Sequence, residues 1–357
     1  MKETSFPQVR PRGPKLPRPG GTARKIISIG QETMVSWKPM HDDGVLPLHM
    51  FPTTPAVDLV SWARHERPLI DEKLAVHGAI AFRGFNLNSA DRFRDLAEAV
   101  IDDLMDSTEH TPLLKKSPIL RPGFYPAEDR LTWHNEKSYA PEWPGRIMFG
   151  CEAPAPSGGE SLIVDSRLMV RRMDPEIRER FRQVGVMYVR NYGNEIGRPW
   201  PMIFQTNQKS EVEAFCRENQ IECEWQDGGR LRTRKVLPAI SIHPKTGEEV
   251  WFNQVQHWHS TSLEPATRAS LQALVGEEGM PRNSFYGDGT RIEDEVIHAL
   301  NELSLQIDGG FLLTRGDVLL MDNMLVAHGR TAYAGDRKIM VAMGEPGSYQ
   351  GLETITN

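Results

Sequence analysis

The sequence predicts a single domain that is mainly β-structure, with helices packed around it. Short apolar runs that indicate buried strands recur along the chain, and segments with apolar side chains at helical spacing stand between them. No internal repeat and no low-complexity linker divides the middle of the chain. With 357 residues, the chain is long enough for one large domain with long insertions between strands.

Composition and charge narrow the class of protein. The chain is 39% hydrophobic and 25% charged, which is ordinary for a soluble globular protein. A net charge of −6 argues against a general nucleic-acid binder, and no apolar run approaches the length of a membrane span. Cys151, Cys216 and Cys223 form no metal-spaced pair, and the N-terminus lacks the apolar core of a signal peptide. We therefore expect a cytoplasmic protein with reduced thiols that binds neither nucleic acid nor a membrane.

Residues 1–25 are rich in proline, arginine and lysine, a composition that disfavours a helix or a central strand. We interpret them as a basic N-terminal arm, most simply a solvated tail, that precedes a single domain of residues 26–357. A basic tract of this kind could also contact an acidic partner such as a carrier protein.

The first part of the chain is expected to form a helix, a strand and a second helix. Apolar residues recur at helical spacing over residues 57–76, although Pro68 interrupts them. Residues 79–82 form a short apolar strand, and residues 90–104 carry one apolar helical face. Residues 109–130 are polar and contain several prolines, so we expect a loop there that helps to line a pocket.

Strands and helices alternate through the rest of the chain. We expect strands at residues 146–151, 161–164, 184–189, 250–254 and 318–321, and one or two strands over residues 229–242. We expect helices at residues 165–183, 210–220, 265–278 and 291–306, and a loop rich in glycine and asparagine at residues 191–200. The run at residues 318–321 is continuously apolar, which is typical of a strand buried on both faces.

Two stretches far apart in the sequence hold the candidate chemical groups. The first is Trp133-His134-Asn135-Glu136, in which a histidine and a carboxylate stand two residues apart. On a strand such residues point to the same face, so an imidazole and a carboxylate can meet at one point. The second stretch runs from Asp322 to Arg330 and places His328 after a buried strand. Two histidines and one carboxylate on one face of a metal leave the opposite face open, which marks non-haem Fe(II) oxygenases.

A His-x-Glu pair is a weak signal by itself. A chain with 11 histidines and 48 acidic residues contains such pairs by chance, and a surface histidine beside a solvated glutamate is the simpler interpretation of His134 and Glu136 taken alone. His257 and His259 share the same spacing. No strand with a matching carboxylate follows them, so we assign them to a pocket wall or a loop.

The surrounding segments resemble the taurine dioxygenase (TauD/TfdA) family of Fe(II)/2-oxoglutarate-dependent oxygenases. They are most similar to the branch that hydroxylates amino acids in peptide natural-product pathways, such as the syringomycin aspartyl β-hydroxylase type and clavaminate synthase-like proteins. The matching segments are residues 77–85, 134–136, 158–161, 250–254 and 322–328 and the basic pair Arg337-Lys338. They cover most of the chain, and they are specific in this order and spacing.

The resemblance implies a double-stranded β-helix, or jelly roll, of two sheets with helices outside. It implies that His134, Glu136 and His328 hold Fe(II), that 2-oxoglutarate is the cosubstrate, and that O2 oxidises an unactivated C–H bond of the substrate. Related halogenases have a small residue where this chain has Glu136, so the resemblance favours hydroxylation over halogenation. Desaturation and ring closure stay open, because they depend on how the substrate is placed.

In the family, an arginine on the strand after the distal histidine binds the far carboxylate of 2-oxoglutarate. Arg337 and Lys338 are the candidates, and adjacent residues of a strand face opposite ways, so only one can point inward. We choose Arg337, because a guanidinium matches a carboxylate with two parallel hydrogen bonds, and we expect Ile339 and Val341 on the same face. Its spacing from His328 is slightly shorter than in taurine dioxygenase, which leaves Lys338 open.

The remaining expectations concern the cosubstrate and the substrate. In the resembled family the residue at Ser161 donates a hydroxyl to a carboxylate of 2-oxoglutarate, although a serine that merely opens a buried strand is an equal alternative. The substrate would be a small amino-acid-like molecule, either free or tethered to a carrier protein, and Asn253, Arg330 and Arg190 are candidates for contact with it. The competing classes are a non-catalytic small-molecule-binding barrel and a metal-dependent hydrolase that needs no 2-oxoglutarate.

Overall fold

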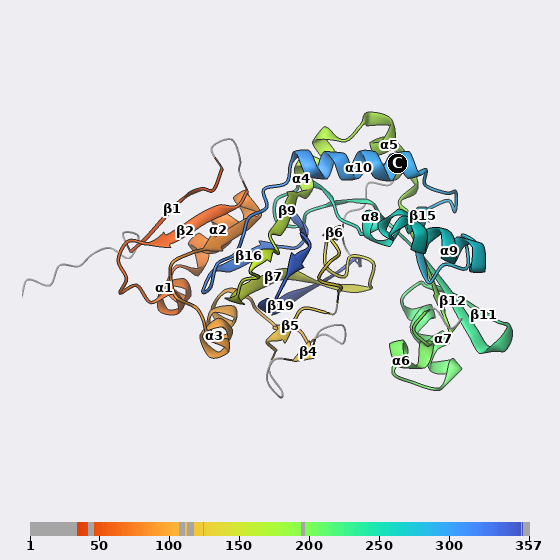
Figure 1. Cartoon of the computed structure of the whole chain (residues 1–357), viewed down its shortest axis with the longest axis horizontal. Coiled ribbons are helices and arrows are strands. Elements are labelled where there is room, and N and C mark those ends of the chain that lie inside the picture. The colour runs from red at the N-terminus through yellow and green to blue at the C-terminus, as the bar shows by residue number, and fades with distance from the viewer. Residues whose placement is uncertain are drawn as a thin grey trace, which may run out of the picture.

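The computed structural model describes residues 34–41, 46–106, 111–112, 118–123, 125–193, 197–350 and 352. The expected arm of residues 1–25 lies outside them. The described chain is mainly β-structure with helices around it, as expected, and its strands form two facing sheets, a further four-stranded sheet and two short strand pairs (Figure 1). No helix in these ranges is long and apolar enough to cross a membrane.

The largest sheet has eight strands. In spatial order they are β1 (Val35–Pro39), β2 (Leu48–Pro52), β3 (Ala79–Phe82), β16 (Val318–Asp322), β7 (Glu142–Ala153), β19 (Lys338–Ser348), β5 (Leu120–Arg121) and β4 (Thr111–Pro112). Strands β2 and β3 are parallel, and the other neighbours are antiparallel. Every residue of β3 and β16 is buried, which explains the continuous apolar sequence of β3 and of residues 318–321 of β16.

A smaller sheet faces the large one and carries two of the candidate metal ligands. Its antiparallel strands are β6 (Leu131–His134), β17 (Val326–Arg330) and β9 (Ser161–Asp165). Ile163 and Val326 of this sheet pack in one apolar cluster with Ile147, Leu319 and Val341 of the large sheet. Two sheets packed face to face over a shared apolar core are the arrangement of a jelly roll.

Three helices cover the outer face of the large sheet, on the left in Figure 1: α1 (Leu59–His65), α2 (Arg67–His77) and α3 (Ala90–Val100). The helix expected at residues 57–76 is thus two helices, and Pro68 lies in the first turn of α2, where a missing N–H costs nothing. Helix α3 ends earlier than expected because Ile101 already has an extended backbone, with φ −131°.

A long insertion between β9 and β16 lies on the other side of the molecule (Figure 1). Its four-stranded antiparallel sheet has the order β11 (Glu222–Gln226), β12 (Arg230–Leu237), β10 (Val186–Tyr192) and β15 (Arg282–Tyr286). Its helices are α4 (Ser166–Arg172), α5 (Pro175–Val184), α6 (Trp200–Phe204), α7 (Lys209–Glu218), α8 (Val255–Trp258), α9 (Pro265–Val275) and α10 (Asp294–Gln306), with 3-10 turns η2 (Asp227–Gly229) and η3 (Ser260–Ser262). The short pairs are β13 (Ile240–Ile242) with β14 (Glu249–Trp251), and β8 (Ser157–Gly158) with β18 (Tyr333–Ala334).

Two expected elements of the insertion differ from the structure. The helix expected at residues 165–183 is divided, because Asp174 caps a new helix by accepting hydrogen bonds from the N–H groups of Glu176 and Ile177, with Pro175 in the first turn. The strand expected at residues 250–254 ends at Trp251. Gln254 instead precedes the short helix α8, which places its amide beside the candidate site.

Candidate metal and cosubstrate site

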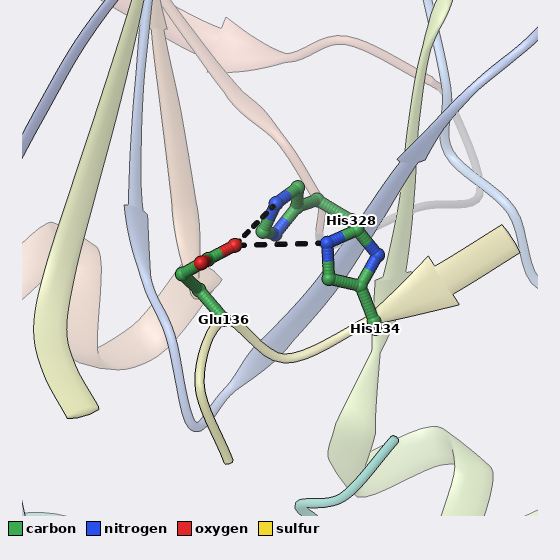
Figure 2. Close-up of side chains that lie close together, drawn as sticks. All are labelled: His134, Glu136 and His328. Carbon is green, nitrogen blue, oxygen red and sulfur yellow. Dashed lines mark ion pairs between the residues drawn. The ribbon is translucent and has the colours of Figure 1, made fainter. Parts of the chain in front are cut away.

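The three candidate ligands converge on one point, although they come from three segments. His134 ends β6, Glu136 lies in the loop after that strand, and His328 is the middle residue of β17. In Figure 2 both imidazoles point at the Glu136 carboxylate, whose Oε2 is 3.7 Å from Nε2 of His134 and 4.0 Å from Nε2 of His328. One donor atom from each residue lies within 4.8 Å of the others, and within the described ranges no other such group was found.

Strand pairing explains why the two histidines meet. His134 and His328 are direct cross-strand partners of β6 and β17, so their side chains leave the same face, and their ring centroids lie 4.5 Å apart. Nδ1 of His134 is 2.8 Å from the backbone oxygen of Thr132, which can only accept, so Nδ1 carries the proton. Nε2 of His134 is therefore the atom with a lone pair for a metal.

The expectation that His134 and Glu136 share a face of one strand is wrong in detail, because β6 ends at His134. A buried network of amides shapes the loop instead. Asn135 donates from its side chain to the backbone oxygen of Asn323 at 2.7 Å, and Gln254 donates from its side chain to the backbone oxygen of Asn135 at 2.8 Å. The sequence motif thus indicates the candidate ligand pair, while the geometry of this pair comes from contacts distant in sequence.

A cavity of about 820 Å³ opens in front of the three ligands. Its wall is strongly cationic, and the arginines in it are Arg121, Arg190, Arg198, Arg282, Arg330 and Arg337. Glu136 is the only carboxylate that lines it within the described ranges. Apolar side chains of the large sheet, among them Leu319 and Ile147, form its floor. The cavity therefore has both an apolar surface and a positively charged surface.

Arg337 lines this cavity together with Ile339 and Val341, the alternation expected from the sequence. It stands just before β19 and not within it, and no carboxylate among the described residues forms an ion pair with it. Burial, with the nearby Arg330 guanidinium, lowers the pKa of Arg337. Lys338 is exposed and pairs with Asp336 at 3.4 Å, away from the cavity wall.

The other candidate residues have different placements. Ser161 lines the cavity at the start of β9, and Arg330 and Arg190 also line it. The Arg330 guanidinium donates to the backbone oxygens of Pro126 and Asp129, both at 2.8 Å, so it holds the loop that precedes β6. Asn253 is buried, and its amide is used by the backbones of Ala239 and Val255, at 2.9 and 3.0 Å. Contact of Asn253 with substrate stays a prediction, and this placement favours a structural role.

His257 and His259 lie where the sequence predicts, in a pocket wall and a turn. The His257 ring stacks on that of His134, with centroids 5.1 Å apart, and burial together with the Arg282 guanidinium lowers its pKa well below the usual range. His257 is therefore neutral at physiological pH. His259 caps the η3 turn through Thr261 and contacts the backbone oxygen of Ile292 at 3.2 Å.

The donor set fits iron. Two imidazoles and one carboxylate on one side of a point, open to a cavity on the other side, suit Fe(II) with a bidentate cosubstrate. A partly buried arginine in the same cavity, which forms no ion pair with any described carboxylate, suits the distal carboxylate of 2-oxoglutarate. A jelly roll with this site defines the class of Fe(II)/2-oxoglutarate-dependent dioxygenases.

Comparison with known proteins supports this assignment and makes it more specific. Residues 46–343 match the model of the family described as taurine catabolism dioxygenase TauD, TfdA family, and the chain belongs to this family. It is 36% identical over 279 residues to the dapdiamide synthesis protein DdaC of Enterobacter agglomerans, covering 78% of this chain and 85% of that protein. It is 28% identical over 293 residues to a clavaminate synthase-like protein of Arabidopsis thaliana, covering 78% and 84%.

Solved structures confirm the fold. The PvcB protein of Pseudomonas aeruginosa superposes with a TM-score of 0.53 at 12% identity, covering 87% of this chain and 90% of that one. A second PvcB structure, described as an Fe, alpha-ketoglutarate dependent oxygenase from an isonitrile synthetic pathway, superposes with a TM-score of 0.52 at 14% identity, with the same coverage. The expected jelly roll and the expected enzyme class are confirmed, and a non-catalytic barrel is not needed to explain the site.

Proposed function

We propose that this dioxygenase hydroxylates an unactivated C–H bond of an amino acid or an amino-acid-derived molecule in natural-product biosynthesis. The observation that carries the proposal is the ligand set His134, Glu136 and His328 at the wall of a cavity that also contains Arg337. The substrate class is supported by the similarity to DdaC, which is named for dapdiamide synthesis, and to a clavaminate synthase-like protein.

Each residue of the site has a proposed role. His134, Glu136 and His328 would hold Fe(II) at the wall of the cavity. Arg337 binds the distal carboxylate of 2-oxoglutarate with two parallel hydrogen bonds, and Ser161 donates its hydroxyl to a cosubstrate carboxylate. When bound, Fe(II) and 2-oxoglutarate would supply, with O2, the power to oxidise an unactivated C–H bond, with succinate and carbon dioxide as the coproducts.

The protein itself supplies orientation and exclusion of water. The apolar floor around Leu319 and Val341 keeps water away from the open side of the metal site. Glu136 provides a carboxylate where related halogenases have a small residue, which favours hydroxylation over halogenation. Desaturation or ring closure would use the same residues. These reactions would differ from hydroxylation only in how the bound substrate is positioned in the cavity.

Location and partners follow from composition and remain part of the proposal. All three cysteines are free thiols, which suits the reducing cytoplasm. The basic segment of residues 1–25 would suit an acidic carrier protein if the substrate arrives as a thioester. A free small-molecule substrate needs no such partner.

Succinate formation tests the proposed function. Purified protein with Fe(II), ascorbate and 2-oxoglutarate should release succinate when incubated with a panel of free and carrier-bound amino acids, and the consumed substrate should gain one oxygen atom in mass. The folded His134→Ala and Glu136→Ala variants should lose this activity by at least about a thousandfold. Substrate conversion without 2-oxoglutarate would refute the proposal in favour of a hydrolase.

A further inference from the structure

One buried carboxylate organises the turn between β16 and β17. Asp322, the last residue of β16, is only 8% exposed. Its Oδ1 accepts hydrogen bonds from the backbone N–H groups of Met324 at 2.9 Å and Leu325 at 3.1 Å. An aspartate that binds the backbone a few residues further on fixes the conformation of a turn. Asp322 thus shapes the segment that leads to His328.

A buried histidine of the insertion holds the second oxygen of this carboxylate. Oδ2 of Asp322 lies 3.1 Å from Nε2 of His243, which is 3% exposed and stands between β13 and β14. Nδ1 of His243 accepts a hydrogen bond from the backbone N–H of Thr246 at 3.1 Å. A ring nitrogen that accepts carries no proton, so the proton of His243 is on Nε2 and is donated to Asp322.

The backbone of the β13–β14 hairpin fixes the position of His243. The N–H of His243 donates to the backbone oxygen of Glu248 at 2.8 Å, and its carbonyl oxygen accepts from the N–H of Gly247 at 2.9 Å. The hydrogen bond to Asp322 therefore ties the turn between β16 and β17 to a rigid part of the insertion. Without this donor, a buried carboxylate oxygen would lack a partner, which is costly and favours a shift of the turn.

The same turn carries a residue that contacts the loop of the candidate carboxylate ligand. Asn323 follows Asp322 directly, and its side-chain oxygen accepts a hydrogen bond from the backbone N–H of Glu136 at 2.7 Å. The backbone oxygen of Asn323 accepts from the side chain of Asn135, also at 2.7 Å. Neither His243, Asp322 nor Asn323 lines the cavity, so these residues can affect the metal site only through Glu136 and its loop.

We propose that His243 is a positioning residue for the metal site and that it acts on Glu136 through Asp322 and Asn323. This inference rests on the proposed function and adds a requirement to it: the insertion is needed for tight metal binding as well as for the wall of the cavity. Groups that orient metal ligands usually contribute 10- to 100-fold to metal affinity. Because His243 acts at a further remove, we expect it to contribute about tenfold.

Two variants separate the contact of His243 with Asp322 from its contact with Thr246. His243→Asn keeps an acceptor for the Thr246 N–H but is too short to reach Asp322, whereas His243→Gln keeps a donor at about the reach of Nε2. Each folded protein competes anaerobically with a chromogenic chelator for Fe(II), without cosubstrate or substrate. We expect His243→Asn to bind Fe(II) about tenfold more weakly than wild type and His243→Gln to stay within about threefold of it.

Two further variants test the route and the specificity of the effect. The double variant His243→Asn/Asn323→Ala should bind Fe(II) no more weakly than Asn323→Ala alone, because substitutions within one hydrogen-bonded chain are not additive. His259→Leu removes another buried histidine, which contacts the backbone oxygen of Ile292 at 3.2 Å, and should leave Fe(II) affinity unchanged even though it lowers the Tm.

The outcomes of these titrations decide the role of His243. Wild-type affinity in folded His243→Asn, an equal loss in His243→Gln or His259→Leu, or losses that add up in the double variant would overturn the proposal. If His243→Asn does not fold, Asp322→Asn takes its place: its oxygen still closes the turn, but its amide N–H opposes that of His243, so the same tenfold loss is expected. A wild-type protein that binds no Fe(II) would instead refute the proposed function.

Discussion

The side chain of Asn323 holds the backbone of Glu136 from both sides. Its Oδ1 accepts a hydrogen bond from the Glu136 N–H at 2.7 Å, and its Nδ2 donates to the Glu136 carbonyl oxygen at 2.9 Å. The same Nδ2 donates to the carbonyl oxygen of Pro144 at 2.8 Å. Asn323 lies in the turn between β16 and β17, so the segment that leads to His328 also positions Glu136, the candidate carboxylate ligand.

Replacing Asn323 should weaken metal binding without touching a ligand. We expect Asn323→Ala to lower Fe(II) affinity about 10- to 100-fold, the usual effect of losing a group that orients a metal ligand. Stability should also fall by about 1–3 kcal/mol, because buried backbone groups lose their partners. Metal titration at a temperature where the variant is folded measures the first effect. Asn301→Ala removes a different side-chain amide contact, with Gln256, and should bind metal normally.

Arg337 and Lys338 should differ sharply in their effect on the cosubstrate. Arg337→Gln should raise the KM for 2-oxoglutarate about 100-fold, since a charged partner is lost from a partly buried carboxylate site. Lys338→Gln should leave the KM nearly unchanged, because Lys338 is exposed and pairs with Asp336. Steady-state kinetics over a range of 2-oxoglutarate concentrations decide between them, and the opposite ranking would assign the cosubstrate to Lys338.

Gly159 controls the space beside Arg337. A Cβ at this position would lie 3.2 Å from Cδ and Nε of Arg337, and its φ of +80° suits glycine. Gly159→Ala should therefore raise the KM for 2-oxoglutarate several-fold while metal affinity stays the same. Gly247 has a similar φ of +71° with nothing within 4 Å, so Gly247→Ala introduces the backbone strain alone. A KM that rises equally in both variants would contradict the contact with Arg337.

The ion pair of Asp294 with Arg268 should make a pH-dependent contribution to the free energy of unfolding. Hydrogen bonds from Arg268 lower the pKa of Asp294 to about 2, compared with about 3.9 in an unfolded chain. Because the folded pKa is the lower one, the stabilisation is complete above about pH 4 and is lost as pH falls toward 2. Asp294→Asn should cost about 1 kcal/mol at pH 7 after allowance for solvent screening.

Thermal unfolding at several pH values measures this effect. The difference in Tm between wild type and Asp294→Asn should be largest near neutral pH and should shrink below pH 4. Glu295→Gln removes a neighbouring exposed charge in the first turn of α10 and should show a smaller difference. A Tm difference that grows as the pH falls would contradict the assigned ion pair.

The structural features that could be predicted are those determined by residues close together in the sequence. Continuous apolar runs predicted β3 and β16, and the spacing of His134 and Glu136, with the distant His328, predicted three residues that the structure brings together as candidate metal ligands. The orientation of Glu136 was not predictable, because it depends on hydrogen bonds from Asn323 across the fold.

The pairing register of strands that are far apart in the sequence could not be predicted either. Arg190 was a candidate without an identified partner, and only the pairing of β10 with β15 places Arg282 opposite it. The early end of β14 at Trp251 turned Gln254 toward the ligand loop, whereas the neighbouring Asn253 was expected to reach the substrate. Nothing local distinguishes these two amides, since their roles are set by the backbone groups that surround them.

The central claim is that His134, Glu136 and His328 bind Fe(II) together with 2-oxoglutarate. The most direct measurement adds Fe(II) and then 2-oxoglutarate to the anaerobic protein and records the weak visible charge-transfer band, in wild type and in His134→Ala. The account predicts a band only when both are present and only in the wild type. A folded wild-type protein without the band, or a band of equal strength in His134→Ala, would contradict it.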